Sequence, residues 1–303
     1  MKKNFYLLVL TLMLGVKLFG QQSIPPIWEK KYGGSGKDRL FSAIATSDGN
    51  YLVLGMTDSK DGDQTTFIPN SANLPEIWVL KINGSNGTIL WRKLISEKAN
   101  LSYYFANEPS NSLVELSDSY ALSLISTYSV INNLQNVEII KLNKQTGSFS
   151  TGNLNVSGVL GVGTSISKTT ISKYQINSGS FIIGASNYSA DARLLLINSS
   201  NTISKTVTKP SSIQVWGEYI QRIEPTPDGG YLLFGSYGKN GIETYCGEPR
   251  SSNVWVAKFD QNLTLVWSKD YGGKTEDDFL DAIILPNNGF YLLGATYCGQ
   301  TGS

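Results

Sequence analysis

The sequence predicts an all-β protein: a β-propeller of four-stranded blades that recur about every 60 residues. Three observations lead to this prediction. The Trp-to-Gly-Gly phrase of residues 28–34 returns near the end of the chain as residues 267–273. Short apolar segments alternate with turns rich in Gly, Asn and Asp. After the first 20 residues, no stretch has the length and periodicity of an ordinary helix.

The first repeat unit contains four predicted strands, at residues 40–45, 51–54, 77–82 and 89–95. Asp48-Gly49 gives the first turn, and residues 83–87 give the turn between the third and fourth strands. A further strand is predicted at residues 28–32, because this segment repeats the Trp-x-Lys phrase of the fourth strands at Trp91 and Trp267.

The unit recurs along the chain. Tyr51 and Gly55 return 180 residues later as Tyr231 and Gly235, which corresponds to three periods. Two weaker units are predicted at 113–143 and 170–198, and a last unit shows two strands, at 279–284 and 290–293. The sequence therefore predicts about five blades, the last one incomplete. A sandwich or a β-solenoid is the alternative, although a solenoid rung is much shorter than this period.

The two ends of the chain leave two interpretations open. In the first, the predicted strand at residues 28–32 completes the last blade and closes the ring. In the second, the chain is the front part of a longer protein. We favour the second, because an open sheet edge invites aggregation.

Composition excludes several classes of function. The chain has 303 residues with 25 Lys+Arg and 24 Asp+Glu, so it lacks the basic excess of a general nucleic-acid binder. It contains no His, which excludes a Ser-His-Asp or Cys-His catalytic arrangement and any zinc site with His ligands. Two Cys are too few for a four-thiolate metal site.

Residues 1–20 have the pattern of a secretory signal peptide, with Lys2 and Lys3 before an apolar run and Gly20 at a cleavage point. Residues 21–303 then form the propeller domain. The apolar run is shorter than the roughly 20 residues of a spanning helix, and no later segment is suited to span a membrane once the signal is removed. We expect the protein to be secreted through the periplasm to the cell surface or the exterior.

Several phrases resemble a family of secreted Bacteroidota repeat proteins exported by type IX secretion, most of them uncharacterised. The phrases lie at residues 28–38, 47–55, 61–63, 77–82 and 267–273. The resemblance implies a propeller-like fold and export, and it implies no catalytic residues. Members of the family usually end in a C-terminal sorting domain, which this chain does not show.

Candidate metal ligands are weak. Asp58, Asp61 and Asp63 share one loop and form a calcium candidate, the single cofactor that we consider, although the spacing is not that of an EF-hand. A solvated turn is the alternative, both here and for the acidic run at residues 276–278 with Asp281. Asp38 and Asp277 each follow a Gly-Gly pair by four residues, which predicts that they cap the turn.

Three lysines recur at one place in the third strands: Lys81, Lys141 and Lys258. They predict either a weak anion-binding ring or repeated solvent-facing residues. The neighbouring Trp78 and Trp255 are expected in the core between blades rather than as sugar-stacking platforms.

Cys246 and Cys298 occur in matching Thr-Tyr-Cys-Gly phrases and predict a disulfide, with pairing of Cys298 to a cysteine beyond Ser303 as the alternative. In the chain-entropy model, closing this 52-residue span contributes about 4 kcal/mol.

Our main functional prediction is a secreted, non-enzymatic propeller that acts as a binding or surface-display scaffold. Loops at one rim, at residues 57–75, 97–110 and 238–252, would hold a carbohydrate or protein ligand. The alternative is a secreted carbohydrate-active enzyme, a lyase or hydrolase. Two carboxylates that converge within roughly 5–10 Å would favour the enzyme.

Overall fold

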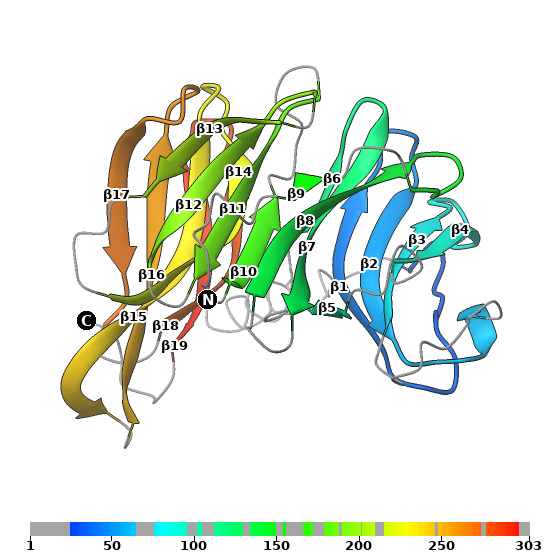
Figure 1. Cartoon of the computed structure of the whole chain (residues 1–303), viewed down its shortest axis with the longest axis horizontal. Coiled ribbons are helices and arrows are strands. Elements are labelled where there is room, and N and C mark those ends of the chain that lie inside the picture. The colour runs from blue at the N-terminus through cyan, green and yellow to red at the C-terminus, as the bar shows by residue number, and fades with distance from the viewer. Residues whose placement is uncertain are drawn as a thin grey trace, which may run out of the picture.

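The structure is a computed structural model that describes residues 25–64, 76–95, 102–104, 112–129, 134–149, 154–155, 166–171, 179–187, 190–200, 202–209, 215–245, 248–273 and 277–296. Over these residues the chain is all-β, with antiparallel sheets that follow one another in chain order (Figure 1). Apart from the short 3-10 turn η1 (Gly62–Gln64), the described residues contain no helix. None of this part of the chain forms a helix long and apolar enough to cross a membrane.

Three sheets have four strands in sequential order. The first contains β1 (Asp38–Ala45), β2 (Tyr51–Thr57), β3 (Glu76–Ile82) and β4 (Ile89–Leu94). The third contains β10 (Ile166–Ile171), β11 (Phe181–Asn187), β12 (Ala190–Ile197) and β13 (Ile203–Thr208). The fourth contains β14 (Val215–Pro225), β15 (Tyr231–Tyr245), β16 (Glu248–Phe259) and β17 (Leu265–Tyr271).

The second and fifth sheets depart from this pattern. The second contains β5 (Ser102–Tyr104), β6 (Leu113–Glu115), β7 (Ser119–Ser129), β8 (Leu134–Asn143) and β9 (Leu154–Asn155), with both β5 and β6 paired to β7. The fifth contains β18 (Asp277–Ile284) and β19 (Phe290–Thr296). Four-stranded antiparallel units in series are confirmed, as are the two strands of the last unit.

Two segments differ from the prediction. Residues 28–32 were predicted as a strand, but they form none; instead, Trp28 and Tyr32 pack on the outer face of the first sheet. Their side chains bond to the turn after β3, where Trp28 Nε1 donates to the Gly84 carbonyl at 2.8 Å and Tyr32 Oη to the Gly87 carbonyl at 2.7 Å. Residues 238–252 were predicted as a loop, but residues 238–245 belong to β15 and residues 248–252 belong to β16, and Gly238 pairs with Ser252.

Each inner sheet buries apolar side chains on both faces. Neighbouring residues of a strand point to opposite faces, so a sheet that lies between two others has near-continuous apolar strands. The first sheet is also covered on both faces, although residues 28–32 take the place of a sheet on one of them: on β2, Leu52 and Leu54 pack against the second sheet, whereas Val53 points to the opposite face with Trp28 and Tyr32. On β15, Leu232 and Phe234 pack against the fifth sheet in the same way.

Trp78 and Trp255 are core residues, as predicted, with 1% and 0% of their surface exposed. Each indole packs against a glycine on the neighbouring second strand, Gly55 on β2 for Trp78 and Gly235 on β15 for Trp255. A Cβ atom at Gly55 would lie 2.5 Å from Trp78 Nε1, and one at Gly235 would lie 2.5 Å from the Trp255 ring. The glycines recur because no larger residue leaves room for the indole.

Candidate functional site

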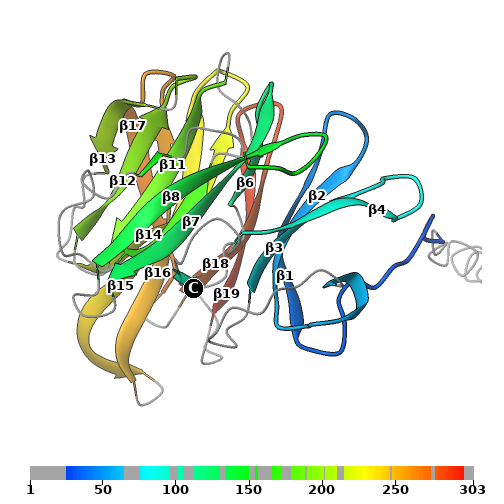
Figure 2. The same cartoon turned by 45° about the vertical axis from the view of Figure 1, so that its right-hand side comes forward.

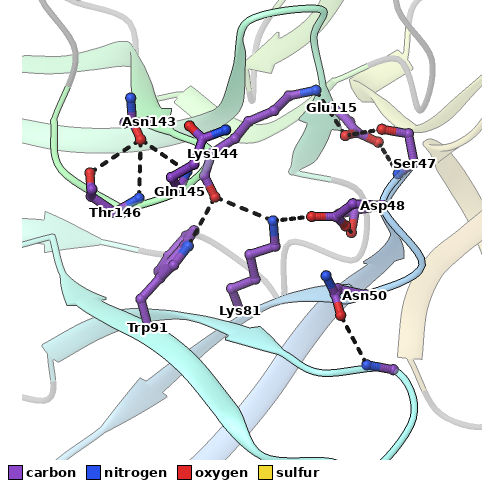
Figure 3. Close-up of polar contacts among 12 residues, drawn as sticks. Ser47, Asp48, Asn50, Lys81, Trp91, Glu115, Asn143, Lys144, Gln145 and Thr146 are labelled. Atoms are coloured by element: carbon purple, nitrogen blue, oxygen red, sulfur yellow. Dashed lines mark hydrogen bonds and ion pairs between the residues drawn. The ribbon is translucent and has the colours of Figure 1, made fainter.

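The recurring third-strand lysines lie in the core, and two of them are anchored to a turn of their own sheet. Lys81 Nζ lies 2.5 Å from Asp48 Oδ2 and 3.3 Å from the Lys144 carbonyl oxygen (Figure 3). Thr46 Oγ1 donates to Asp48 Oδ1 at 2.5 Å. Partial burial acts to raise the pKa of Asp48, but hydrogen bonds from Lys81, Thr46 and Asn50 hold that pKa well below its ordinary value.

The same arrangement recurs in the fourth sheet. Lys258 Nζ lies 2.6 Å from Asp228 Oδ1 and also donates to Thr226 Oγ1. Thr226 Oγ1 in turn donates to Asp228 Oδ1 at 2.5 Å. Hydrogen bonds from Lys258, Thr226 and the Gly230 amide hold the pKa of Asp228 well below its ordinary value. The Thr-x-Asp-Gly turn and the lysine therefore form one structural unit.

Lys141 is the exception. It is buried and pairs with Ala121, which is three residues after Asp118, whereas Lys81 pairs with Leu52, which is four residues after Asp48. The carboxylate of this turn therefore stands one position later in the chain than Asp48 does. Burial lowers the pKa of Lys141, and the charge of Asp118 only partly offsets this. The prediction of repeated solvent-facing lysines is therefore wrong: Lys81, Lys141 and Lys258 are 5%, 6% and 8% exposed. Carboxylates of the protein itself hold the first and third, which disfavours the anion-binding ring as well.

A second polar contact joins the first and second sheets (Figure 3). Glu115 Oε1 lies 2.9 Å from Lys144 Nζ and accepts from Ser47 Oγ at 2.8 Å. Glu115 Oε2 accepts from the Ser47 amide at 2.7 Å. Trp91 Nε1 donates to the Lys144 carbonyl oxygen at 3.0 Å. These groups are hydrogen-bond partners of one another, so the cluster links the first sheet to the second.

The loop with Asp58, Asp61 and Asp63 folds over the Gly-rich segment at residues 33–37. Asp63 Oδ2 accepts from the Gly33 amide at 2.9 Å, Asp61 Oδ1 accepts from the Ser35 amide at 2.7 Å, and Asp58 Oδ1 accepts from the Lys37 amide. Among the described residues, no group of three or more acidic, His or Cys side chains is arranged to hold a metal ion. Calcium binding at this loop stays a prediction and would compete with these amide bonds.

The predicted turn caps are confirmed. Asp38 Oδ2 accepts from the Gly34 amide at 3.0 Å, and Asp277 Oδ2 accepts from the Gly273 amide at 2.7 Å. The acidic run was predicted as a solvated turn, but Asp277, Asp278 and Asp281 all lie in β18.

Arg222 joins two carboxylates on the first strands of neighbouring sheets. Its Nε lies 2.6 Å from Glu224 Oε1 on β14, and its Nη1 contacts Asp281 Oδ1 on β18. The Glu224 side chain is 6% exposed and that of Asp281 is 55% exposed. The sequence analysis singled out neither Arg222 nor Glu224. The repeat period could have pointed to this pair, because Arg222 and Asp281 are 59 residues apart and occupy equivalent positions of two repeat units. Arg222 pairs with Phe234 and Asp281 pairs with Leu293.

A buried ion pair lies between the third and fourth sheets. Lys209 Nζ lies 2.7 Å from Glu218 Oε1, with side chains 6% and 2% exposed. Lys209 Nζ also lies 4.6 Å from the centre of the Trp255 ring. Tyr237 Oη donates to Asp270 at 3.2 Å, and burial together with the charges of Asp270 and Glu218 raises the pKa of Tyr237. Cys246 and Cys298 lie outside the described residues, so their pairing stays a prediction.

No family model matches the chain, and no curated protein sequence matches it. Solved structures with a similar arrangement include an α-L-arabinofuranosidase of Fusarium graminearum in complex with an iminosugar inhibitor, at 13% identity and TM-score 0.48, covering 84% of this chain and 76% of that one. A second structure of that enzyme is covered over 66% of its length.

Two further solved structures are similar to this chain. A thermostable family-43 glycoside hydrolase matches at 8% identity and TM-score 0.45, over 87% of this chain and 85% of that one. A protein of unknown function from Bacteroides caccae matches at 12% identity and TM-score 0.38, over 77% and 68%.

These comparisons contradict the prediction of a non-enzymatic scaffold. The arabinofuranosidase and the family-43 protein are glycoside hydrolases, which agrees better with the alternative prediction of a carbohydrate-active enzyme. At TM-scores below 0.5, these structures identify no catalytic residue or substrate of this chain.

Proposed function

We propose that the protein is a carbohydrate-active enzyme of the hydrolase type, with Glu224 and Asp281 as its carboxyl pair. The observation that carries this proposal is the guanidinium of Arg222, which contacts both carboxylates. One guanidinium contacts both carboxyl groups, so they lie close together, and glycoside hydrolysis uses a pair of carboxyl groups that flank the scissile bond. They also come from the first strands of adjacent sheets, so neither lies on an isolated turn.

The two carboxylates have different surroundings, which suits different roles. Asp281 is open to solvent and also accepts from the Ala282 amide at 2.8 Å, so it is the group that faces a sugar ring or an attacking water. Glu224 is buried beside it and supplies the second carboxyl. Arg222 positions both side chains, because a planar guanidinium fixes the geometry of its carboxylate partners.

Hydrolysis of a panel of aryl α- and β-glycosides, with an α-L-arabinofuranoside included, tests the proposal. We expect Glu224→Gln and Asp281→Asn each to lower kcat/KM at least about 100-fold while the melting temperature stays within a few degrees. Glu115→Gln is the matched control, because Glu115 is also held by a cation but lies between the first and second sheets. Full activity in both variants, or no activity of the native chain on any glycoside, would contradict the proposal.

We also infer that the sheets belong to a β-propeller of about five blades and that the protein is exported as the Bacteroidota family is. The repeat period near 60 residues and the serial antiparallel sheets support the first inference. The leader pattern of residues 1–20 supports the second. N-terminal sequencing of protein collected outside the cell should find Gln21 as the first residue. A chain that keeps Met1 would contradict export by this leader.

A further inference from the structure

One buried lysine lacks the partners that its equivalents have. The third-strand lysines occupy the same position in three sheets: Lys81, Lys141 and Lys258. Asp48 holds Lys81 at 2.5 Å, and Asp228 holds Lys258 at 2.6 Å. Lys141 makes neither an ion pair nor a hydrogen bond in the part of the chain that the structure describes, and Asp118 acts on it only through its charge.

The turn that precedes the strand paired with Lys141 is one residue shorter than its counterpart. In the first sheet, the Thr46 amide donates to the Asn50 carbonyl at 2.8 Å and encloses three residues. In the second sheet, the Leu116 amide donates to the Ser119 carbonyl at 2.8 Å and encloses two. A shorter turn presents its aspartate at a different place relative to the lysine of the third strand.

The shorter turn also changes the chemistry around the lysine. Thr46 and Thr226 each place a hydroxyl beside the aspartate of their turn, whereas Leu116 supplies an apolar side chain. Asp118 instead accepts from its own neighbour, Ser119 Oγ, at 2.8 Å. The second sheet therefore gives its lysine neither the carboxylate nor the hydroxyl that the first and fourth sheets supply.

The face that carries Lys141 is otherwise apolar. Lys141 pairs with Ala121 and lies on the same face of β8 as Ile139, because alternate residues of a strand share a face. Ala121 and Ile139 belong to a core cluster that includes Phe181 of the third sheet. Figure 2 shows β7 and β8 of the second sheet beside the third sheet. Residues 172–180, between β10 and β11, contain no Asp or Glu that could replace the missing carboxylate.

A lysine in such surroundings is a nucleophile. Burial favours the uncharged amine, and it lowers the pKa of Lys141. A free amine has a lone pair that attacks carbonyl carbon atoms, which is the chemistry of lysines that form Schiff bases. Lys141 is 6% exposed, whereas Ser117 and Asp118 of the turn before its paired strand are exposed. Only a small reagent fits such a site, and it approaches from the end of the sheet that this turn forms.

We propose that Lys141 is a site of covalent attachment for small aldehydes. The nitrogen attacks the carbonyl carbon, a C=N bond replaces the C=O bond, and the carbonyl oxygen leaves as water with both amine hydrogens. The step needs no oxidant or reductant. The site lies on β8, whereas Glu224 and Asp281 lie on β14 and β18, so it is separate from the proposed carboxyl pair.

Reductive trapping tests this proposal on the native chain. Glycolaldehyde, a small hydroxyaldehyde, is added at pH 7 with cyanoborohydride, which reduces the imine to a stable amine, and mass spectrometry of peptides identifies the modified lysines. We expect Lys141 to react at least about 10-fold faster than Lys81 and Lys258, since one unit of pKa changes the free-amine fraction about tenfold. In denaturant the three lysines should react at equal rates, because only the fold distinguishes them.

A variant with a restored turn completes the test. Leu116→Thr with a glycine inserted between Asp118 and Ser119 reproduces the Thr-Ser-Asp-Gly order of residues 46–49. We expect it to slow the reaction of Lys141 at least about 10-fold and to leave Lys258 unchanged. Leu116→Val is the matched control. Valine has the shape of threonine without its hydroxyl, so the rate at Lys141 should stay the same.

Reaction of Lys141 no faster than that of Lys81 and Lys258 would overturn the proposal, and this comparison needs no variant. An unchanged rate at Lys141 in a folded restored-turn chain would also overturn it, because the missing carboxylate would then not be the cause. The readout is covalent labelling, so it is independent of whether the chain hydrolyses glycosides.

Discussion

Replacing Asp48 by Asn should destabilise the protein by leaving a buried lysine without its counter-charge. The side chain of Lys81 is 6% exposed, and its nearest carboxylate oxygen is Asp48 Oδ2 at 2.5 Å. After the change, Lys81 keeps the Lys144 carbonyl oxygen at 3.3 Å and the Tyr120 ring at 5.3 Å. Removing one partner of a fully buried pair costs about 3–5 kcal/mol, and since Asp48 is half-exposed we expect about 2 kcal/mol.

Denaturant unfolding at pH 7 measures this loss, and a melt should show a decrease of about 4 °C for a chain of this size. The double variant Asp48→Asn with Lys81→Leu is the control. It removes both charges and fills the site with an apolar side chain, so it should recover at least half of the lost free energy of unfolding. If Asp48→Asn were as stable as the native chain, or if the double variant were less stable than the single one, the assigned ion pair would be wrong.

The same ion pair predicts a dependence on pH. The pKa of Asp48 is lower in the folded chain than in the unfolded chain, so the pair stabilises the fold fully above the unfolded pKa near 4. The stabilisation decreases as the pH falls through the folded pKa. The difference in unfolding free energy between the native chain and Asp48→Asn should therefore be constant from pH 7 to 5 and should shrink below pH 4. A difference that grows on acidification would refute the assignment.

Two further predictions concern other contacts between sheets. Lys209→Met leaves the Glu218 carboxyl, which is 2% exposed, without its ion-pair partner and should cost about 3–5 kcal/mol in unfolding free energy, whereas adding Glu218→Leu should restore most of it, as denaturant titration will show. Gly87→Ala should cost at least about 1 kcal/mol, because φ is +72° and the new Cβ would lie 2.7 Å from the Trp28 ring; if Gly49→Ala, at φ +76° in open space, cost the same, the contact with Trp28 would be irrelevant.

The structure confirms four-stranded antiparallel units in series and corrects the strand predicted at residues 28–32. The turn signals and apolar segments predicted four strands in the first unit, and β1 to β4 follow them. The same Trp-x-Lys phrase that forms a strand at Trp267 forms none at Trp28. The phrase is alike in both places, but strand formation needs a neighbouring strand, and that neighbour is not encoded within the phrase. Trp28 still makes the indole contact that Trp91 makes one unit later.

The candidate site was harder to predict than the fold. Arg222, Glu224 and Asp281 are 59 residues or less apart in sequence, but they meet only because β14 and β18 are first strands of neighbouring sheets and the Arg222 side chain reaches from one to the other. The lysines show the same limit: a charged residue at a regular position is interpreted as solvent-facing until the partner carboxylate of the turn is placed beside it. Local patterns carry no record of which distant side chain neutralises a charge.

By itself, the sequence determined the all-β class, the four-stranded unit, the turn caps at Asp38 and Asp277 and the core positions of Trp78 and Trp255. These depend on side-chain alternation and on bonds that span a few residues, which a short window of sequence contains. The tertiary structure alone decided which lysines are buried, which carboxylates share Arg222 and which apolar side chains of β18 and β19 are exposed in the described residues. Those outcomes depend on contacts between sheets, where burial sets the cost of every unpaired charge and exposed apolar side chain.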